Sequence, residues 1–219
     1  RIDEYLDRVT NLPTSPRILP QLLDLLAQDD VDCGGIVELI TFDPSLTAHL
    51  LQLCNSVAFA GATRVTEVGE AVSRLGFQQT YRLVAVIAGG RSLSPAQTNY
   101  GLAEGELWHH SVASAVAAQC IAGELGEDVN IPFTAALLHD IGKIVLGCAL
   151  DETYERLVRE TEERNQTLVD TEMEILGVQH AEVGGRLLER WNFPDQLVSA
   201  VWNHHHPTQA REHDRLAAI

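Results

Sequence analysis

A histidine beside an aspartate, His139 and Asp140, ends the apolar run in AALLHDIGK and is the pair of residues best suited to chemistry in this sequence. Ionisable side chains are costly to bury unless they are paired or bind a metal ion. Imidazole and carboxylate groups are both common ligands of divalent transition metals. The pair therefore predicts a metal site at the end of a buried helix.

More histidines recur at places that helices could bring together. Glu106 lies four residues before His110, so both side chains project from one helix face. His180 follows in VQHAEVG, and His204 and His205 lie in VWNHHHP. A set rich in imidazoles, with carboxylates and without thiolates, suits iron, manganese, nickel or zinc. We therefore expect one or two divalent ions.

The helix that carries the central pair restricts how a metal can be shared. Neighbouring residues on a helix splay by about 100°, so His139 and Asp140 can share an ion only over the helix edge. A second helix must then complete the shell, and His110 is the expected supplier. Lys143 lies on the same face as Asp140, where it could neutralise a phosphate oxygen or simply pair with the aspartate.

Each histidine also has a purely structural explanation. His109 is expected to face solvent, and His180 could cap the start of the helix that follows it. The histidines of HHHP could lie at a helix C-terminus, where the helix dipole favours imidazolium, and we expect no other role for His206. The metal prediction therefore depends on the set rather than on any one member.

The overall charge is strongly negative. Lys and Arg number 15 against 31 Asp and Glu, which gives a net charge of -16. Such a surface repels phosphate backbones and anionic lipids. We therefore expect neither DNA or RNA nor a membrane as the main partner.

The cysteines and the hydropathy pattern indicate a cytoplasmic protein. Cys33, Cys54, Cys120 and Cys148 show neither CxxC spacing nor the density of a disulfide framework, so ordinary buried thiols are expected. No apolar run reaches the roughly 20 residues that a membrane span needs, and no signal peptide is visible. Both ends of the chain look trimmed, because it starts at Arg1 and stops inside a predicted helix.

The pattern of apolar residues predicts an all-α fold, because no segment alternates polar and apolar residues over five positions. Asp43 as N-cap and Pro44 at the first helical position begin one buried helix, and Gly76 separates two others. These two are expected to be packed bundle helices rather than a DNA-binding pair, since the second is too apolar for a groove. After the linker SLSPAQTNYGLAEGE, helices are expected at about 103–125, 131–149, 151–165, 168–177, 179–192 and 194–205.

The segments ELWHHS, AALLHDIGK, VQHAEVGGRLLERWNFP and VWNHHHP, in that order, resemble the HDOD family, a branch of the HD superfamily of metal-dependent phosphohydrolases. In the N-terminal half, LPTSPRILPQLLDLL, FDPSLTAHLLQLCNSVAFAG and VGEAVSRLGFQQTYRLVA are similar to the family's additional helical bundle. The resemblance covers nearly the whole chain. It implies an N-terminal helical bundle at 1–95, packed on an HD-like helical core at 96–219.

The resemblance also implies the roles of particular residues. HD-type metal positions fall on His110, His139, Asp140, His180, His204 and His205. Glu106 matches an additional carboxylate ligand of some HD-GYP phosphodiesterases, and Lys143 matches the lysine of their HDIGK motif. Two departures stand out: no DGxGYP-like segment follows HHHP, which argues against a cyclic-di-GMP phosphodiesterase of the HD-GYP type, and the last aspartate of the HD motif is expected beyond Ile219.

Three hypotheses for the function follow from the resemblance. HDOD proteins are bacterial signalling modules, often joined to receiver, GGDEF or EAL domains, and many are regarded as inactive. The favoured hypothesis is a non-catalytic regulatory module that binds other signalling proteins or domains and keeps an HD-type metal pocket. The alternative is a metal-dependent phosphohydrolase or phosphodiesterase acting on a nucleotide or phosphoester, with Asp140 and Lys143 as catalytic residues. A third hypothesis is a metal or redox sensor.

Overall fold

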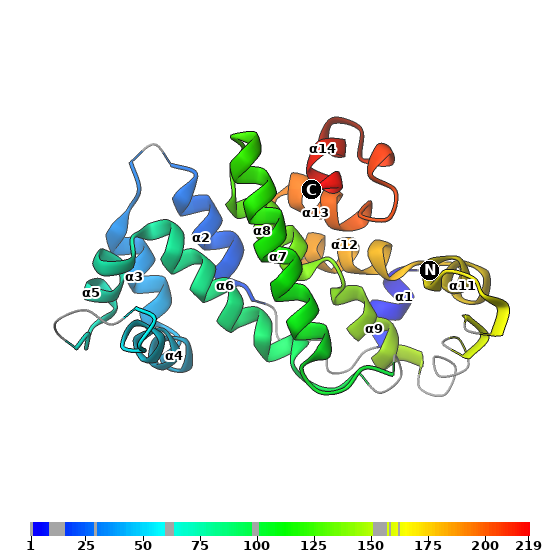
Figure 1. Ribbon diagram of the computed structural model, residues 1–219, viewed down its shortest axis with the longest axis horizontal. Coiled ribbons are helices and arrows are strands. Elements are labelled where there is room, and N and C mark those ends of the chain that lie inside the picture. Colours follow the sequence, from blue (N-terminus) through cyan, green and yellow to red (C-terminus); the bar gives the residue numbers. More distant parts are fainter. Residues whose placement is uncertain are drawn as a thin grey trace. The chain divides into compact units, whose positions relative to one another are not determined.

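The computed structural model describes residues 2–8, 16–28, 30–59, 64–97, 101–150, 157, 159–161 and 163–219. Over these residues the regular structure is helical, with one isolated antiparallel bridge between Gln97 and Leu102 (Figure 1). The predicted all-α class is confirmed. Most of the helix predicted at 151–165 lies outside the described residues.

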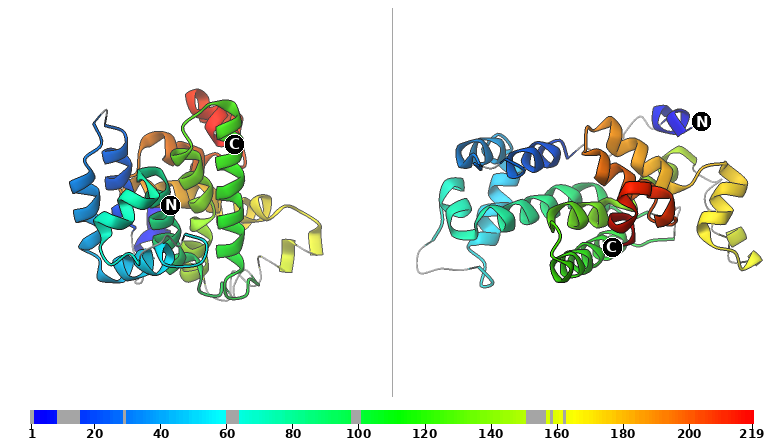
Figure 2. Two further views of the ribbon diagram at one scale, coloured as in Figure 1. Left: turned by 60° about the vertical axis from the view of Figure 1, so that its left-hand side comes forward. Right: turned by 90° about the horizontal axis from the view of Figure 1, so that it is seen from above.

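Two compact units make up the chain, and their boundary differs from the predicted one. One unit spans residues 16–89, and the other joins the N-terminal helix α1 (Ile2–Arg8) to residues 90–219. The sequence placed α1 in the first domain and the boundary after residue 95. The difference arises because α1 packs on the later helices α9 and α12, where Leu6 is only 1% exposed (Figure 2).

The unit of residues 16–89 is built from short helices. They are α2 (Ile18–Leu26), α3 (Cys33–Thr41), α4 (Pro44–Cys54), α5 (Val68–Leu75) and the larger part of α6 (Phe77–Leu93). Helix α3 contacts α2, α4 and α5, and Ile36 and Ile40 on α3 are buried. As predicted, Asp43 caps α4 by accepting a hydrogen bond from the backbone N–H of Leu46 at 2.9 Å. Gly76, at φ 77°, ends α5.

The second unit carries every predicted metal residue. Besides α1, its helices are α7 (Glu106–Leu125), α8 (Asn130–Leu138), α9 (Ile141–Leu150), α11 (Leu168–Leu176), α12 (His180–Arg190), α13 (Asp195–Trp202), the 3-10 helix η2 (Pro207–His213) and α14 (Asp214–Ala218). Helix α8 packs against α7 and α13, and α12 packs against α9 and α13 (Figure 1). This arrangement brings the C-terminal ends of α8 and α13 and the N-terminal end of α12 to the same part of the unit.

The single helix predicted at 131–149 is broken in the structure. His139 and Asp140 form a turn between α8 and α9, and the N–H of Lys143 donates to the carbonyl of Asp140 at 3.0 Å. The turn redirects the chain, so that α8 packs on α7 while α9 crosses α12. The crossing is close: a Cβ on Gly142 would collide with the carbonyl oxygen of His180 and lie 2.7 Å from the backbone nitrogen of Gly184.

Residues 130–149 are the one segment of the described chain that is long and apolar enough to pass a composition test for a membrane span. The sequence did not predict such a segment. Within the protein, however, 72% of its most apolar window is buried. This burial is typical of a core segment that packs against neighbouring helices.

The four cysteines, all among the described residues, form no disulfide, and their exposure corrects the expectation of buried thiols. Cys54 is buried in the first unit, whereas Cys33, Cys120 and Cys148 are exposed. Burial raises the pKa of the Cys54 thiol above its ordinary value, which keeps this side chain protonated.

Candidate metal centre

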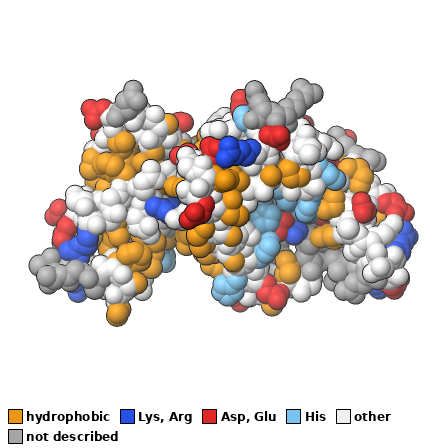
Figure 3. Space-filling model, turned by 45° about the horizontal axis from the view of Figure 1, so that its top comes forward, with side chains coloured by type: hydrophobic (Ala, Val, Ile, Leu, Met, Phe, Trp, Pro, Cys, Tyr) orange, Lys and Arg blue, Asp and Glu red, His pale blue; other side chains and the backbone are white. Residues whose placement is uncertain are grey.

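The predicted ligand residues converge on one point from four places in the chain. The imidazole centroids of His110 and His139 lie 5.0 Å apart, and those of His139 and His204 lie 5.1 Å apart. The rings of His180 and His205 are 4.9 Å apart. Histidine side chains accordingly gather on one face of the molecule (Figure 3). Residues as distant in sequence as 110 and 205 therefore share a single site.

Asp140 lies at the centre, with its side chain only 3% exposed. Its Oδ2 atom is 3.3 Å from the Nε2 atom of His139 and 3.6 Å from that of His110. Its Oδ1 atom is 3.2 Å from Nε2 of His180 and 4.0 Å from Nε2 of His204. The two carboxylate oxygens thus face two different groups of imidazoles.

Each group has the size of a metal shell. His110, His139 and Asp140 form one group, and His180, His204 and His205 form the other, with the ligand atoms of each group within 4.8 Å of one another. The Nε2 atoms of His110 and His139 are 3.1 Å apart, and those of His180 and His205 are 2.9 Å apart. Two nitrogen atoms that bind the same metal ion, each at about 2.0–2.1 Å, lie roughly 3 Å from each other. The observed distances between the Nε2 atoms therefore fit a shared ion.

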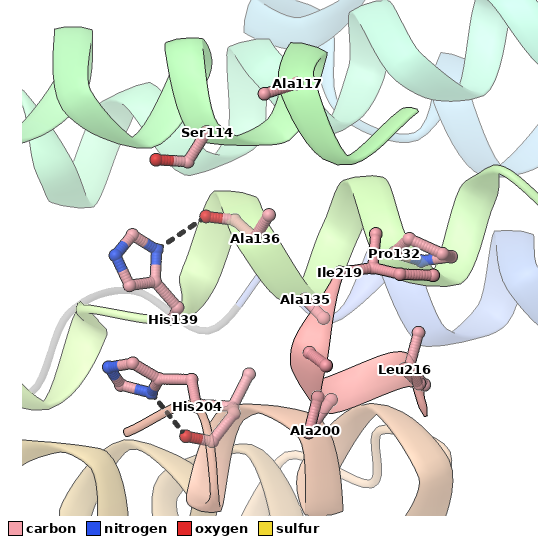
Figure 4. A pocket seen from close by; sticks show the side chains of 13 residues that line it. Ser114, Ala117, Pro132, Ala135, Ala136, His139, Ala200, His204, Leu216 and Ile219 are labelled. Atoms are coloured by element: carbon pink, nitrogen blue, oxygen red, sulfur yellow. Dashed lines mark hydrogen bonds between the residues drawn. The ribbon is translucent and has the colours of Figure 1, made fainter. Parts of the chain in front are cut away.

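Hydrogen bonds on the far side of the rings aim these nitrogens inward. The Nδ1 atoms of His139 and His204 lie 2.7 Å from the carbonyl oxygens of Ala136 and Val201 (Figure 4). When Nδ1–H donates to a carbonyl, Nε2 keeps its lone pair and can bind a metal. The buried Nε2 atom of His204 has no hydrogen-bond partner in the described structure. A buried polar atom without a partner is costly, and a bound cation would satisfy it.

Glu172 provides the corresponding contact for His180. Its Oε2 atom accepts from Nδ1–H of His180 at 2.7 Å and from the backbone N–H of the same residue at 2.9 Å. Glu172 lies on α11 and is 0% exposed. A carboxylate behind a ligating imidazole fixes the ring and increases its basicity.

The sequence analysis missed Glu172, although a signal was present. Glu172 lies four residues after Leu168 and four before Leu176, on the same helical face as these two leucines. An acidic residue on an apolar face needs a buried partner. That partner could not be identified without the fold.

The electrostatics keep the central carboxylate ionised. Burial alone would raise the pKa of Asp140, but the neighbouring imidazoles of His139 and His180 and the charge of Lys143 outweigh it. The pKa of Asp140 therefore lies well below its ordinary value. Burial alone would lower the pKa of His180, but its hydrogen bonds to Asp140 and Glu172 outweigh burial and raise the pKa of this imidazole.

Three other imidazoles, those of His204, His205 and His110, are held neutral. Burial lowers the pKa of His204 to about 3. Burial, with the charge of His180 as the next cause, lowers the pKa of His205 to about 4. Burial and the charge of His139 also lower the pKa of His110. A neutral imidazole is the form that binds a metal ion.

Lys143 adopts the second of the two roles considered for it. Its ammonium group donates to Oδ2 of Asp140 at 2.7 Å, and its side chain is 18% exposed. This is the oxygen that faces His110 and His139. The positive charge of Lys143 therefore repels a cation bound by His110 and His139 more strongly than a cation bound by His180, His204 and His205.

Glu106 is not brought to the site. It is exposed, and its carboxylate accepts from the backbone N–H of Ala103 at 2.6 Å, at the start of its own helix. His109 and His206 are also exposed, and neither belongs to the two groups of candidate ligands. The proposed capping role of His180 is taken by another residue, because Gln179 and Glu182 form the capping box of α12.

Comparisons with known proteins agree with the fold. The model of the HDOD domain matches residues 12–207. An uncharacterized protein of Treponema pallidum (strain Nichols) is 30% identical over 210 residues, which cover 94% of this chain and 40% of the relative. Ribonuclease Y of Petrotoga mobilis is 31% identical over 142 residues, which cover 64% of this chain and 21% of the enzyme. The chain therefore spans less than half the length of these relatives.

Solved structures are similar over most of the chain. An HDOD domain protein of unknown function from Geobacter sulfurreducens is 26% identical, with a TM-score of 0.72 and coverage of 94% of this chain and 68% of that one. A candidate phosphohydrolase from Shewanella amazonensis SB2B is 27% identical, with a TM-score of 0.74 and coverage of 97% and 76%. A candidate signal transduction protein from Marinobacter aquaeolei VT8 is 25% identical, with a TM-score of 0.76 and coverage of 99% and 48%.

Proposed function

Because the chain belongs to the HDOD family, we propose that it is a bacterial signalling module that binds one or two divalent transition-metal ions and regulates other signalling proteins or domains. The observation that carries the metal proposal is the buried, unpartnered Nε2 atom of His204 beside the ionised carboxylate of Asp140. Imidazoles with carboxylate oxygens are the donors that iron, manganese, nickel and zinc accept.

The ligands of the two ions follow from the two groups. His110, His139 and Oδ2 of Asp140 would hold one ion, and His180, His204, His205 and Oδ1 of Asp140 would hold the other. A bound ion would supply Lewis acidity toward a phosphate or a water molecule. Glu172 orients His180, and Asp140 supplies the negative charge that both groups share.

Regulation is favoured over turnover by the charges of the protein. The net charge of -16 disfavours an anionic substrate or RNA as the partner. The exposed thiols of Cys33, Cys120 and Cys148 favour a reducing, cytoplasmic setting.

A metal-dependent phosphohydrolase is the second candidate, and the position of Lys143 favours it. The ammonium group lies at the edge of the centre, close enough to Asp140 to offset negative charge on a phosphoester beside it. Hydrolysis by the purified protein of bis(p-nitrophenyl) phosphate in the presence of Mn²⁺, lost in the Asp140→Ala variant with its fold intact, would establish this candidate.

The metal proposal is tested by elemental analysis of protein purified without added metal. We expect bound transition metal in the native protein and a lower content in the His204→Ala and His110→Ala variants. His109→Ala is a matched control, because His109 is the exposed neighbour of His110 on α7 and lies outside both groups. A metal-free native protein that also fails to take up Mn²⁺, Fe²⁺ or Zn²⁺ would overturn the proposal.

A further inference from the structure

The two groups of candidate ligands share Asp140 but are not equivalent. The three-histidine group consists of His180, His204 and His205, and the two-histidine group consists of His110 and His139. Oδ1 of Asp140 faces the three-histidine group, and Oδ2 faces the two-histidine group. The three-histidine group therefore offers one more imidazole to an ion.

A carboxylate lies behind the three-histidine group. The side chain of Glu172 is fully buried, with Oε2 2.7 Å from Nδ1 of His180, and the side chain of His180 is only 1% exposed. Charges interact more strongly where water is excluded. In the two-histidine group, by contrast, the side chain of His110 is 57% exposed. The three-histidine group should therefore hold a cation more strongly.

Lys143 places a positive charge on the other side of Asp140. It is the single lysine in residues 1–219, because all the other residues counted as Lys or Arg are arginines. Its ammonium group donates to Oδ2, the oxygen that faces the two-histidine group, at 2.7 Å. Lysine carries a compact charge, which can take the place of a cation beside one carboxylate oxygen. Lys143 therefore competes with an ion for Oδ2.

The backbone of Lys143 is fixed, whereas its side chain can move. Its backbone N–H donates to the carbonyl of Asp140 at 3.0 Å, in the first turn of α9. This turn is held against α12, because Gly142 leaves no room for a Cβ beside the carbonyl of His180. The side chain of Lys143 is 18% exposed, so rotation about its flexible stem can carry the ammonium group into water.

We propose that the candidate centre takes up two ions in a fixed order and that Lys143 controls the second. The three-histidine group and Oδ1 of Asp140 hold the first ion while Lys143 stays on Oδ2. The two-histidine group holds a second ion only after Lys143 has left Oδ2. This inference rests on the proposed metal site and specifies its regulation, because the availability of metal decides whether Lys143 pairs with Asp140 or with solvent.

Titration calorimetry of the chelator-treated protein with Mn²⁺ measures the two steps. Mn²⁺ is suitable because exposed thiols prefer softer ions. In the native protein we expect one tight step and a second that is at least about tenfold weaker or too weak to detect. Lys143→Met keeps the apolar stem without the charge, so it should strengthen the second step by about tenfold or more and the first step by less.

Arg164→Met is the matched control for the loss of one positive charge. Arg164 is exposed and pairs with Glu174 outside both groups of ligands, so its removal should change neither step. Two equal steps in the native protein, or a second step that is the same in Lys143→Met, would overturn the proposal.

Ligand variants establish the order of binding. His205→Ala removes a member of the three-histidine group and should abolish the tight step. His110→Ala should keep the tight step and lose the weaker one. His109→Ala, at the exposed neighbour of His110, should leave both steps unchanged. Retention of the tight step in His205→Ala, or its loss in His110→Ala, would contradict the order.

The single lysine allows its side chain to be followed directly by NMR. Labelling of lysine with ¹³C at Cε gives one signal from residues 1–219, and Zn²⁺ is the probe because it is diamagnetic. The signal should move little with the first equivalent of Zn²⁺ and clearly with the second. A complete change with the first equivalent, or none with the second, would show that Lys143 does not control the second ion.

These measurements also separate the order of binding from the existence of the metal site. If the native protein binds neither Mn²⁺ nor Zn²⁺, the metal proposal and the proposed order both fail. If it binds metal in two steps that do not respond to Lys143→Met, the order fails and the metal proposal stands.

Discussion

Glu172 accepts hydrogen bonds from the backbone N–H and from the Nδ1–H group of His180, and so fixes the orientation of this imidazole. Substitution of Glu172 tests how far the candidate metal centre depends on a residue that is not itself a candidate ligand. Glu172→Gln can keep a hydrogen bond to the ring but loses the charge. We expect about 10–100-fold weaker metal binding by calorimetry, and a larger loss in Glu172→Ala.

Glu174 offers a matched control for this change. It lies on the same helix, is exposed, and pairs with Arg164 at 2.9 Å away from the centre. Glu174→Gln should therefore leave metal affinity unchanged. If Glu172→Gln binds metal as tightly as the native protein, Glu172 has no positioning role.

Acidification should destabilise the metal-free protein. Burial lowers the pKa of His204 to about 3, so this ring stays neutral in the folded state while the unfolded chain takes up a proton below about 6.5. The unfolded state then binds more protons, and the free energy of unfolding falls by up to about 1.4 kcal/mol per pH unit for this group between these two values. His110 and His205, with lowered pKa values, act in the same direction.

His180 opposes this trend. Its pKa is raised in the folded state, so its contribution is present below about 6.5 and is lost as pH rises through the folded value. The pKa values of three imidazoles are lowered and that of one is raised, so acidification should lower the free energy of unfolding overall. Urea unfolding of the chelator-treated protein should therefore show lower stability at pH 5 than at pH 7. A smaller dependence is expected in His204→Gln, and a rise in stability on acidification would refute the assignment.

The convergence of the candidate ligand residues could be predicted from the sequence, but their hydrogen-bond partners could not. His110, His139, Asp140, His180, His204 and His205 were recognised because unusual residue types recur in a familiar order. All of them meet in the structure. The hydrogen bond from Lys143 to Asp140 was one of two open roles, because residue spacing fixes a helix face but not a side-chain partner. Glu172 depends on the packing of α11 beside α12, which no local pattern encodes.

The crossing of α9 and α12 determines where His180 stands relative to Asp140. At this crossing, Gly142 leaves no room for a Cβ beside the carbonyl of His180. Gly142→Ala should force the two helices apart, lower stability by several kcal/mol and reduce metal content. Thermal unfolding and elemental analysis measure the two effects.

Gly123 provides the comparison for this variant. It lies inside α7, and a Cβ there meets nothing within 4 Å. Gly123→Ala should raise stability by about 0.5–1 kcal/mol, because alanine is the better helix former. A neutral Gly142→Ala would show that the crossing tolerates a methyl group.

At the level of elements, the caps were predictable and the break was not. Asp43 and Gly76 act through contacts within a few residues, so the sequence reveals them. The break at His139 and Asp140 lies inside a continuous apolar run with no proline at the break. It follows from the separate packing partners of α8 and α9, which are distant in sequence.

At the level of the molecule, α1 belongs to the unit that holds the metal centre. Asp3 pairs with Arg186 at 3.0 Å and with Arg190 at 2.7 Å on α12, and Leu6 is buried. Leu6→Ala should lower the free energy of unfolding by about 2–4 kcal/mol in chemical denaturation. Asp7→Asn, at a side chain that is 68% exposed, should change it little. Similar losses in both variants would mean that ion pairs rather than burial hold α1.

The domain boundary was predicted from a polar linker, and the structure divides the chain elsewhere. Linker composition marks a local change along the chain. It contains no information about the return of α1 to helices that lie some 180 residues later, as in the pair of Asp3 and Arg186. The charges of α1 are compatible with many sites, so this contact was not predictable.

The return of α1 sets an order of events during synthesis. Residues 16–89 form a continuous segment that can collapse as soon as it leaves the ribosome. Helix α1, made earlier, has to wait for α12, and its buried leucine stays uncovered throughout that interval. Helix α1 is therefore translated before the other described helices but is among the last to find its place, and a nascent chain stalled before residue 180 should leave it open to proteases.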